Sequence, residues 1–567
     1  MNISTNGFNY DNVTIISDDI NGLFWNDGPS TNPEIAIDNL NNIHAVWSDG
    51  TDGSWGSDDE ILYINCTTTG EWSVPLVISD GFNDIFWNDG VSNNPDIIID
   101  STNSIHVVWE DSTNGLWGND TEIMYSRFSY DIGWTNATVI SDGFNNIFWN
   151  NDSSVNPKIA IDSKDKIHVI WVDYTNGLWG TDTEIMHVSF TETTGWSNIT
   201  LISDEYGNNS WNDGNSWNPA IAIDKSDNIH IIWEDDTDGI WGGDREIMYK
   251  SYEETSGWSN VSIISDGHNH IYWNYGYSYN PAIAIDSQNE IHVVWEDTTD
   301  SPAWWGYDTE IMYSSYTAST GWTLPIVISD GYNDIFWNDG PSYNPDISVD
   351  SRDIIHVVWE DFTDGIWGFD TEIMYAYCEK TIGWSNATVI SDGFNNVYWN
   401  DGGSYDVSII AKDGNAYVVW DDTTDGIWGY DTEIMYTRIS IPTITITSPN
   451  LTDTWTIGKS QSIYWTSEGN ISNVKIELYN ISSLVLEINA STINDGEYFW
   501  TLPSDLDLNT LYKIKITDIS NPAIYDYSDF FEITTRSSPS RIPGFNVIIV
   551  IGISSLLLLY YIKKMKK

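Results

Sequence analysis

The chain has 567 residues, with 84 Asp and Glu against 21 Lys and Arg, which gives a formal net charge of −63. Such a charge repels nucleic acid and anionic lipid headgroups and favours Ca²⁺ and other cations. Hydrophobic residues make up 41% of the chain, which is enough apolar material for a buried core and excludes wholesale disorder. The length indicates about two to four domains.

A sequence motif of about 62 residues recurs seven times between residues 13 and 440. Its most regular part is an apolar run around a histidine, Ile43-His44-Ala45-Val46-Trp47 in the first copy. The run recurs at His106, His168, His230, His292 and His356, and Tyr417 replaces the histidine in the seventh copy. The two cysteines, Cys66 and Cys378, occupy equivalent positions in copies one and six, so no disulfide between them is expected.

Each copy contains four short strand-like runs separated by Asp, Asn, Gly and Ser. In the second copy the predicted strands are Pro95–Asp100, Ile105–Trp109, Glu122–Arg127 and Thr138–Ser141. The repeats show no helical periodicity. Four strands in each of seven units predict an all-β, seven-bladed β-propeller over residues 13–440.

The two ends of the repeat region predict how the ring closes. A fourth-strand sequence, Val13–Ser17, precedes the first copy, and the seventh copy ends near Ile439 without a fourth strand. The N-terminal strand is therefore expected to complete the last blade, which removes the exposed edges of an open ring. A linear solenoid would instead need polar caps at both ends, and the sequence shows none.

After the repeats the chain changes character. Residues 441–535 show strand-like alternation without the motif and predict an immunoglobulin-like β-sandwich. Residues 536–545 read as a linker, the apolar run 546–562 as a transmembrane helix, and the lysine-rich residues 563–567 as a cytoplasmic tail. This arrangement predicts a single-pass protein of the cell membrane with its bulk outside the cell.

The first residues lack the basic and apolar regions of a signal peptide. The alternatives are a misassigned start, a missing N-terminal segment, or insertion directed by the C-terminal helix alone. An exported chain would be open to glycosylation. Asn-x-Ser/Thr sequons recur before the fourth strands, at Asn12, Asn136, Asn198, Asn260 and Asn386.

Candidate ligand contacts lie in the loop before the first strand of each blade. In a propeller this loop shares a face with the loop between the second and third strands. It carries one tryptophan in every copy: Trp25, Trp87, Trp149, Trp211, Trp273, Trp337 and Trp399. Tryptophan faces stack on sugar rings, and Asp and Asn bond to hydroxyls, so these residues are candidate glycan contacts. The alternative is that they pack between blades.

Candidate calcium ligands end the loop between the second and third strands. Every copy has an Asp-x-Glu set there: Asp58/Glu60, Asp120/Glu122, Asp182/Glu184, Asp244/Glu246, Asp308/Glu310, Asp370/Glu372 and Asp431/Glu433. Hard cations take several carboxylate oxygens, so Ca²⁺ is the candidate cofactor. The alternative is that these acids cap turns and accept backbone N–H groups. Their presence in all seven copies favours the structural use.

Three parts of the sequence resemble known families. The repeat, roughly Pro-x-Ile-Ala-Ile-Asp, Ile-His-Val-Val-Trp-Glu-Asp and Glu-Ile-Met-Tyr, resembles sialidase-type (BNR-like) propeller repeats, and Ser251–Ser259 resembles a degenerate Asp-box turn. A second resemblance is to the immunoglobulin-like module of the Ser-Thr-rich, GPI-anchored (yeast cell-wall synthesis Kre/Knh-like) family. It rests on Ile446–Pro449, Trp455–Gly458, Ile463–Thr466, Trp500–Pro503 and Tyr525–Ser528. Pro543-Gly544-Phe545, an apolar helix and a lysine tail resemble the PGF-CTERM-like archaeal anchor, which implies removal of the helix by a sortase-like enzyme.

Catalysis of the sialidase type is not expected. A sialidase needs converging arginines, and the four in the propeller, Arg127, Arg245, Arg352 and Arg438, fall in different strands and loops. The six histidines of the repeated motif fall one to a blade, so they are expected to be packing or hydrogen-bonding groups rather than metal ligands. Carboxylates are abundant, so another glycosidase mechanism stays open.

These observations favour a non-catalytic binding or adhesion protein at the cell surface. Its propeller would present a face rich in Trp, Asp and Asn to a surface glycan or an envelope protein, with Ca²⁺ as candidate cofactor and no nucleic-acid partner. The alternatives are an extracellular glycoside hydrolase of sialidase-like fold and a structural component of the cell envelope.

Overall fold

The computed structural model describes residues 9–535 except for 11–12, 19–25, 27, 54–55, 81–87, 89, 116–117, 143–149, 151, 177–179, 205–213, 238–242, 267–275, 299–307, 331–339, 365–367, 381, 393–399, 401, 425–429, 470, 509–510, 521 and 523. The described residues form strands and turns and contain no helix. A membrane-spanning helix is accordingly absent from this part of the chain. The predicted linker, transmembrane helix and lysine tail, 536–567, lie outside the described residues.

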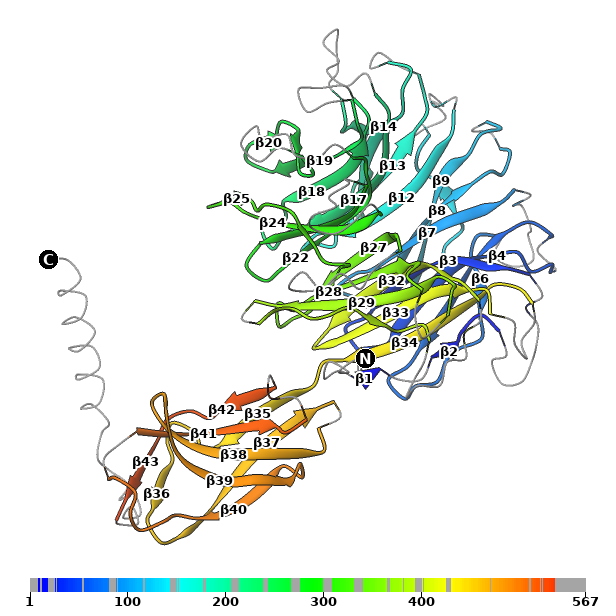
Figure 1. Ribbon diagram of the computed structural model, residues 1–567. Helices are drawn as coiled ribbons and strands as arrows, with labels where there is room; N and C mark the ends of the chain where they lie inside the picture. The colour runs from blue at the N-terminus through cyan, green and yellow to red at the C-terminus, as the bar shows by residue number, and fades with distance from the viewer. Residues whose placement is uncertain are drawn as a thin grey trace, which may run out of the picture. The chain divides into compact units, whose positions relative to one another are not determined.

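Residues Asn9–Ser440 form one compact unit of seven antiparallel sheets (Figure 1). Their innermost strands, which define blades one to seven in chain order, are β3 (Ser30–Ile37), β7 (Ser92–Ile99), β12 (Ser154–Ile161), β17 (Ser216–Ile223), β22 (Ser278–Ile285), β27 (Ser342–Val349) and β32 (Ser404–Lys412). Each innermost strand contacts the next one, and β32 contacts β3. The sheets therefore form a closed ring of propeller blades, as the repeats predict.

The second and third strands of each blade pair in register. The second strands are β4 (Ile43–Asp49), β8 (Ile105–Asp111), β13 (Ile167–Asp173), β18 (Ile229–Asp235), β23 (Ile291–Asp297), β28 (Ile355–Asp361) and β33 (Asn415–Asp422). The third strands are β5 (Glu60–Cys66), β9 (Glu122–Ser129), β14 (Glu184–Thr191), β19 (Glu246–Glu253), β24 (Glu310–Thr317), β29 (Glu372–Glu379) and β34 (Glu433–Ser440). Each second strand pairs residue by residue with its third strand, for example Asp111 with Glu122 in blade two.

The outer edge of a blade differs from the single fourth strand expected. In blades two to six it consists of two short strands, both paired with the third strand: β10 (Gly133–Trp134) and β11 (Thr138–Val139), β15 (Gly195–Trp196) and β16 (Thr200–Leu201), β20 (Gly257–Trp258) and β21 (Ser262–Ile263), β25 (Gly321–Trp322) and β26 (Ile326–Val327), β30 (Gly383–Trp384) and β31 (Thr388–Val389). Blade one has β6 (Leu76–Val77). Part of the segment that resembles an Asp-box turn is thus strand β20.

The predicted fourth strand of blade two ends early because side-chain bonds replace the strand ladder at Ser141. Its Oγ accepts the N–H of Ile123 at 2.7 Å and donates to Oε2 of Glu122 at 2.5 Å. The equivalent serine makes the same two bonds in blade three, where Ser203 Oγ accepts the N–H of Ile185 and donates to Glu184.

The N-terminal strand closes the ring. Strands β1 (Asn9–Tyr10) and β2 (Thr14–Ile15) pair antiparallel with β34 of blade seven. Ile16 is fully buried, and Ser17 accepts the N–H of Ile434 and donates to Glu433. The predicted closure is confirmed, and it begins at Asn9, upstream of the expected Val13.

A tryptophan from each second strand fills the interface between blades. Trp171 of blade three is 0% exposed and packs with Val108 and Ile123 of blade two. Its indole Nε1 donates to Asp173 at 3.1 Å, which satisfies the one polar atom of the ring. The expected core position of these residues, such as Trp47 and Trp109, is confirmed, since both are 0% exposed.

The residues from Ile441 onward belong to a second compact unit. One sheet contains β35 (Thr443–Ser448), β37 (Ser460–Glu468) and β40 (Glu497–Thr501). The other contains β36 (Thr454–Thr456), β38 (Asn473–Asn480), β39 (Ser483–Ile493), β41 (Leu511–Asp518), β42 (Tyr525–Tyr527) and β43 (Phe531–Thr534). Trp455, Trp465 and Trp500 are buried in a shared core, which gives the two-sheet immunoglobulin-like sandwich expected.

Candidate functional site

Every innermost strand of the propeller carries a β-bulge near its start, at an Asn-Pro pair in blades one to six and at Asp406-Val407 in blade seven. In blade two the register between β7 and β8 shifts between Asn93 and Asp96, and Asn94 takes a positive φ of 48°. Asparagine tolerates this left-handed conformation, and the proline that follows has no N–H to leave unpaired. The bulge turns the side chain of Asn94 out of the strand's regular alternation.

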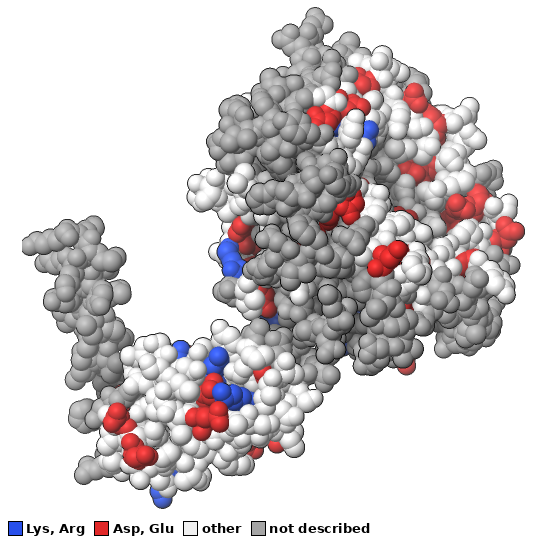
Figure 2. All heavy atoms as spheres, viewed as in Figure 1, with Lys and Arg blue, Asp and Glu red and all other residues white. Residues whose placement is uncertain are grey.

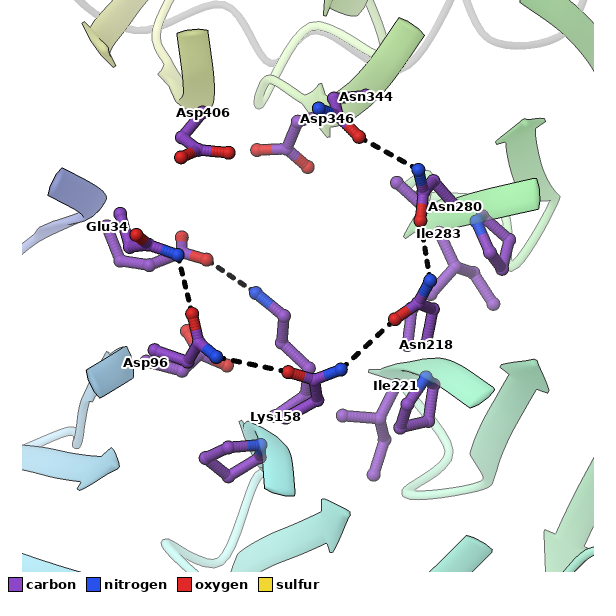
Figure 3. A pocket seen from close by; sticks show the side chains of 18 of the residues that line it. Glu34, Asp96, Lys158, Asn218, Ile221, Asn280, Ile283, Asn344, Asp346 and Asp406 are labelled. Carbon is purple, nitrogen blue, oxygen red and sulfur yellow. Dashed lines mark hydrogen bonds and ion pairs between the residues drawn. The ribbon is translucent and has the colours of Figure 1, made fainter. Parts of the chain in front are cut away.

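The asparagine side chains bond to one another from blade to blade around the channel (Figure 3). Each amide donates to the next carbonyl oxygen, from Asn32 to Asn94 (2.5 Å), Asn156 (3.2 Å), Asn218 (3.1 Å), Asn280 (2.6 Å) and Asn344 (2.8 Å). Blade seven carries Asp406 at the equivalent position, also with a positive φ. An amide ring with one carboxylate thus lines the channel.

A pocket of about 380 Å³ lies at this level of the channel and takes residues from all seven innermost strands. The position after each Asn-Pro or Asp-Val pair differs between blades, as Glu34, Asp96, Lys158, Ala220, Ala282, Asp346 and Ser408 in order. The asparagine and the proline before this position are shared by six copies, and the isoleucine after it by all seven. The pocket therefore departs from the sevenfold pattern where all blades meet.

Blades six, seven, one, two and three form a polar arc in the pocket. Lys158 Nζ lies 2.5 Å from Oε1 of Glu34, and Ser408 Oγ donates to the other oxygen of Glu34 at 2.8 Å. Figure 3 shows this ion pair reaching across from blade three to blade one. The neighbouring carboxylates of Glu34 and Asp96 raise the pKa of Lys158 against the effect of burial, so its ammonium stays charged.

Two aspartates of the arc tie neighbouring blades together. Asp96 accepts the N–H groups of Ile97 at 2.8 Å and, in blade three, Ile159 at 2.7 Å. Asp346 does the same with Ile347 at 2.8 Å and Ile409 at 2.9 Å. Burial raises the pKa of each carboxyl to about 7. These two groups therefore change charge near neutral pH.

Blades four and five provide an apolar wall opposite the arc. Ala220 and Ala282 stand where the other blades carry charged or hydroxyl side chains, and Ile221 and Ile283 follow them in the pocket lining. Both isoleucines are half-buried, whereas the equivalent Ile97 is only 4% exposed. The pocket thus offers hydrogen-bonding groups on one side and aliphatic carbon on the other.

The Asp-x-Glu sets lie at the junctions between blades. Each glutamate is the first residue of a third strand and is at most 1% exposed. Among the described residues, the Glu122 side chain accepts one hydrogen bond, from Ser141 of its own blade. Its acidic neighbours are Asp142 and Asp120 of the same blade and Asp173 of blade three. Burial raises the pKa of Glu122 to about 8 and that of Glu60 to about 9.

In blades one, two, three and six the aspartate of the set folds back over a glycine. At Gly118 the φ is +148°, and a Cβ there would lie 2.2 Å from Oδ1 of Asp120. A side chain at this position would displace the aspartate, so the Gly-x-Asp spacing holds the carboxylate beside the glutamate. Blade three repeats this geometry at Gly180 and Asp182.

The histidines act as hydrogen-bonding groups, as expected. His106 Nδ1 lies 2.7 Å from the hydroxyl of Tyr125, and its Nε2 lies 3.4 Å from Asp100. Among the described residues, one group of three possible metal ligands lies within 4.8 Å, Asp286, Glu290 and His292. The ammonium of Lys380 lies 2.9 Å from Glu290 and 4.0 Å from Asp286, so this group already has a cation.

Blade three replaces the tyrosine of this pair with His187, which stacks on His168 with 5.3 Å between ring centroids. Burial lowers the pKa of His168 to about 2 and that of His187 to about 3. At these two imidazoles the unfolded chain therefore binds more protons than the folded one below about pH 6.5, and their contribution to stability is lost as the pH falls from there.

We expect His187→Tyr, which restores the pair of the other blades, to reduce this acid sensitivity. At pH 5 the variant should be more stable than the parent by about 2 kcal/mol, since one fewer buried imidazole must stay neutral. At pH 8 the two should differ little. Thermal unfolding at both pH values checks this, and an equal difference at the two values would contradict the assignment.

The remaining residues considered from the sequence are the loop tryptophans and the propeller arginines. All seven loop tryptophans, Trp25, Trp87, Trp149, Trp211, Trp273, Trp337 and Trp399, lie outside the described residues. The propeller arginines lie in four different blades, and none lines the channel pocket among the described residues. Arg245, for example, lies over the rings of Trp217 (4.0 Å) and Tyr279 (5.0 Å) and pairs with Glu234 at 3.4 Å.

Reading the sequence along the chain missed the channel pocket. The signal is present in the position after Asn-Pro, where Glu, Asp, Lys, Ala, Ala and Asp follow in six successive copies. It becomes visible only when the copies are compared position by position. Strand geometry then places these side chains around one axis.

Residues 448–533 match the model of the Kre9/KNH-like N-terminal Ig-like domain, which confirms the resemblance of this module. No curated protein matches the chain. The chain is similar to a PL25 ulvan lyase bound to -[GlcA(1-4)Rha3S]-, at 12% identity and TM-score 0.47, over 74% of this chain and 95% of that one. It is also similar to a protein of unknown function from Dyadobacter fermentans (9% identity, TM-score 0.42, 77% of this chain and 99% of that one). A third similar structure is an α-L-arabinanase of Penicillium chrysogenum (13% identity, TM-score 0.38, 61% of this chain and 92% of that one).

Proposed function

We propose that this is a non-catalytic surface protein whose propeller binds a glycan at the mouth of its channel. The observation that carries the proposal is the loss of sevenfold symmetry in the channel pocket. Residues shared by all copies build the blades, whereas the position after the Asn-Pro pair, which varies from Glu34 to Asp346 in the first six copies, faces one pocket of about 380 Å³. This volume falls in the range of small-ligand sites, roughly 300–1,000 Å³.

The chemistry of the pocket suits a sugar. A pyranose ring has hydroxyls at its edge and C–H groups on its faces. The carboxylates and amides of the polar arc can bond to the hydroxyls, while Ile221 and Ile283 can pack against a C–H face. The ion pair between Lys158 and Glu34 holds the arc in place before a ligand arrives, which lowers the entropic cost of binding.

The location at the cell surface is part of the proposal. The apolar run 546–562 and the lysines after it support a C-terminal anchor, with the propeller and the sandwich outside the cell. The match of residues 448–533 to a cell-wall-related Ig-like module agrees with such a setting.

Filling the pocket should weaken glycan binding without unfolding the protein. We expect Ala282→Leu to weaken binding at least tenfold, because the larger side chain occupies the space beside the apolar wall. Ala318→Leu, on the exposed turn at the outer edge of the same blade, is the matched control and should bind like the parent. A glycan array followed by calorimetric titration of the best hit measures both, and equal affinities would contradict the pocket assignment.

A glycoside hydrolase is the second candidate. The observation that favours it is the pair of pocket carboxyls, Asp96 and Asp346, whose pKa burial raises to about 7, a value suited to a general acid at neutral pH. Incubation of the same glycan panel with the protein distinguishes a hydrolase from a binding protein. If the parent cleaves a glycan and the Asp96→Asn variant does not, the hydrolase replaces the binding proposal. No binding and no turnover would leave the structural envelope role.

A further inference from the structure

Every blade junction holds a buried carboxylate oxygen that has no hydrogen-bond partner among the described residues. The oxygen is Oε1 of the glutamate that begins each third strand, and all seven copies show it. The other oxygen of each accepts one bond from a serine, as Ser141 gives to Glu122. Buried polar atoms in folded proteins are almost always partnered, so seven equivalent exceptions require an explanation.

In the first two blades the neighbouring aspartate adds a second such oxygen. Oδ2 of Asp58 and Oδ1 of Asp120 are buried and have no partner among the described residues. Each lies two residues before its glutamate and acts on it electrostatically. In these two blades, two carboxyl groups that interact electrostatically therefore each carry a buried, unbonded oxygen.

The charges around each junction are negative. The carboxyl groups that act electrostatically on Glu122 are Asp142, which follows the outer strand of the same blade, Asp120, and Asp173 at the end of β13 in the next blade. The equivalent groups around Glu246 are Asp266, Asp244 and Asp297. Several buried like charges without a counter-ion cost far more than the hydrogen bonds here repay.

A proton does not resolve this arrangement. A protonated Oε1 would become a donor, and the described residues offer it no acceptor, while an unprotonated Oε1 remains an acceptor without a donor. A bound cation, in contrast, takes several carboxylate oxygens as ligands, and these oxygens then need no hydrogen-bond donor.

We propose that each blade junction binds a divalent cation, best suited to Ca²⁺. The ligands are the glutamate that begins the third strand, the aspartate two residues before it, and the aspartate after the outer strand. An all-oxygen donor set of this kind suits Ca²⁺, which accepts irregular geometry and completes its shell with water, whereas Mg²⁺ demands a compact octahedron. No three of these oxygens lie within 4.8 Å of one another in the described structure, so binding draws the carboxylates inward.

A cation at each site would link adjacent blades by attracting carboxylates from both. The glutamate and its two aspartates belong to one blade, while Asp173 and its equivalents belong to the second strand of the following blade. Asp173 accepts bonds from Trp171, Ser154 and Asn150, so its carboxylate is fixed by its own blade. A cation between them neutralises the repulsion across the junction. This inference is independent of the proposed glycan binding.

Calcium binding to the full chain, after bound metal ions have been removed with a chelator, tests the proposal. Equilibrium dialysis in 0.15 M NaCl with excess Mg²⁺ should find about seven bound Ca²⁺ per chain, and the unfolding midpoint should rise steeply with Ca²⁺, since a ligand of the folded state stabilises it. Less than one bound Ca²⁺ per chain, with the same midpoint in Ca²⁺ and in chelator, would overturn the proposal whatever the variants show.

Glu122→Gln separates a cation site from a structural acceptor. The amide can still accept from Ser141 but carries no charge, so we expect about one fewer bound Ca²⁺, a lower midpoint in Ca²⁺ and no lower midpoint in chelator. Glu71→Gln, at an exposed position, is the matched control and should leave the stoichiometry unchanged. Equal losses of midpoint with and without Ca²⁺, or equal losses of bound Ca²⁺ in the two variants, would overturn the proposal in favour of a turn cap or of diffuse surface binding.

Discussion

A chain shortened to begin at residue 18 is expected to lose most of the stability of its propeller. The deletion removes β1 and β2 and leaves the outer edge of β34 unpaired. It also removes Ile16, which is fully buried, and the serine that bonds Glu433. Burial of one isoleucine is worth about 1.5–3 kcal/mol, and a buried polar group left without a partner costs about 1–3 kcal/mol, so the loss is on the order of 5 kcal/mol.

Thermal unfolding and light scattering measure this effect together. The shortened chain should unfold at a much lower temperature and aggregate through the open strand edge. A chain that begins at residue 9 retains both short strands and is the control, which should behave like the parent. If the two shortened chains had equal midpoints, the N-terminal strand would not be holding the ring closed.

In chelator, the protein is expected to become less stable as the pH rises from 7.5 to 9. Burial raises the pKa of the junction glutamates to about 9, or about 8 for Glu122, from an ordinary value near 4.5. The folded chain therefore holds protons that the unfolded chain has released, and this stabilising contribution is lost as the pH passes through the folded pKa. Each such group contributes up to about 1.4 kcal/mol per pH unit, so seven of them produce a change of several kcal/mol.

Saturating Ca²⁺ should remove this pH dependence. A cation that binds the carboxylates displaces their protons, so the stabilisation by Ca²⁺ grows with pH across the same window. The imidazoles of blade three are neutral in both states above pH 7.5 and do not interfere. The measurement is the unfolding midpoint at several pH values, with Ca²⁺ and with chelator. Parallel curves would show that the glutamates do not share their buried space with a cation.

The architecture of the propeller could be predicted because the same strand pattern occurs seven times, so each copy supports the assignment of the others. Seven copies of one strand pattern indicate seven blades, and the displaced fourth strand at Val13–Ser17 reveals the closure that β2 confirms. The equivalent positions of Cys66 and Cys378 predict that they do not pair, and both thiols are free. The buried tryptophans of the second strands follow from the same alternation.

The candidate sites could be predicted only in part, because they depend on contacts between copies. The sequence places Glu122 in a loop with Asp120, but Asp142 and Asp173 come from the outer strand and from the next blade. The channel pocket depends on the bulge at Asn94, which turns side chains toward a common axis. A pattern read along one strand carries no information about which residues of other strands share that axis.

The closure of blade seven also has a consequence for synthesis. Residues 9–17 leave the ribosome well before their partner strand, Glu433–Ser440, which follows more than 400 residues later. At about 5–20 residues per second the early segment waits roughly 20–90 s for its place in the sheet. During that time it must avoid the six third strands made before β34, each of which has nearly the same sequence. Its two paired stretches, Asn9–Tyr10 and Thr14–Ile15, are two residues long each, so they form few hydrogen bonds with a wrong strand edge and dissociate from it readily.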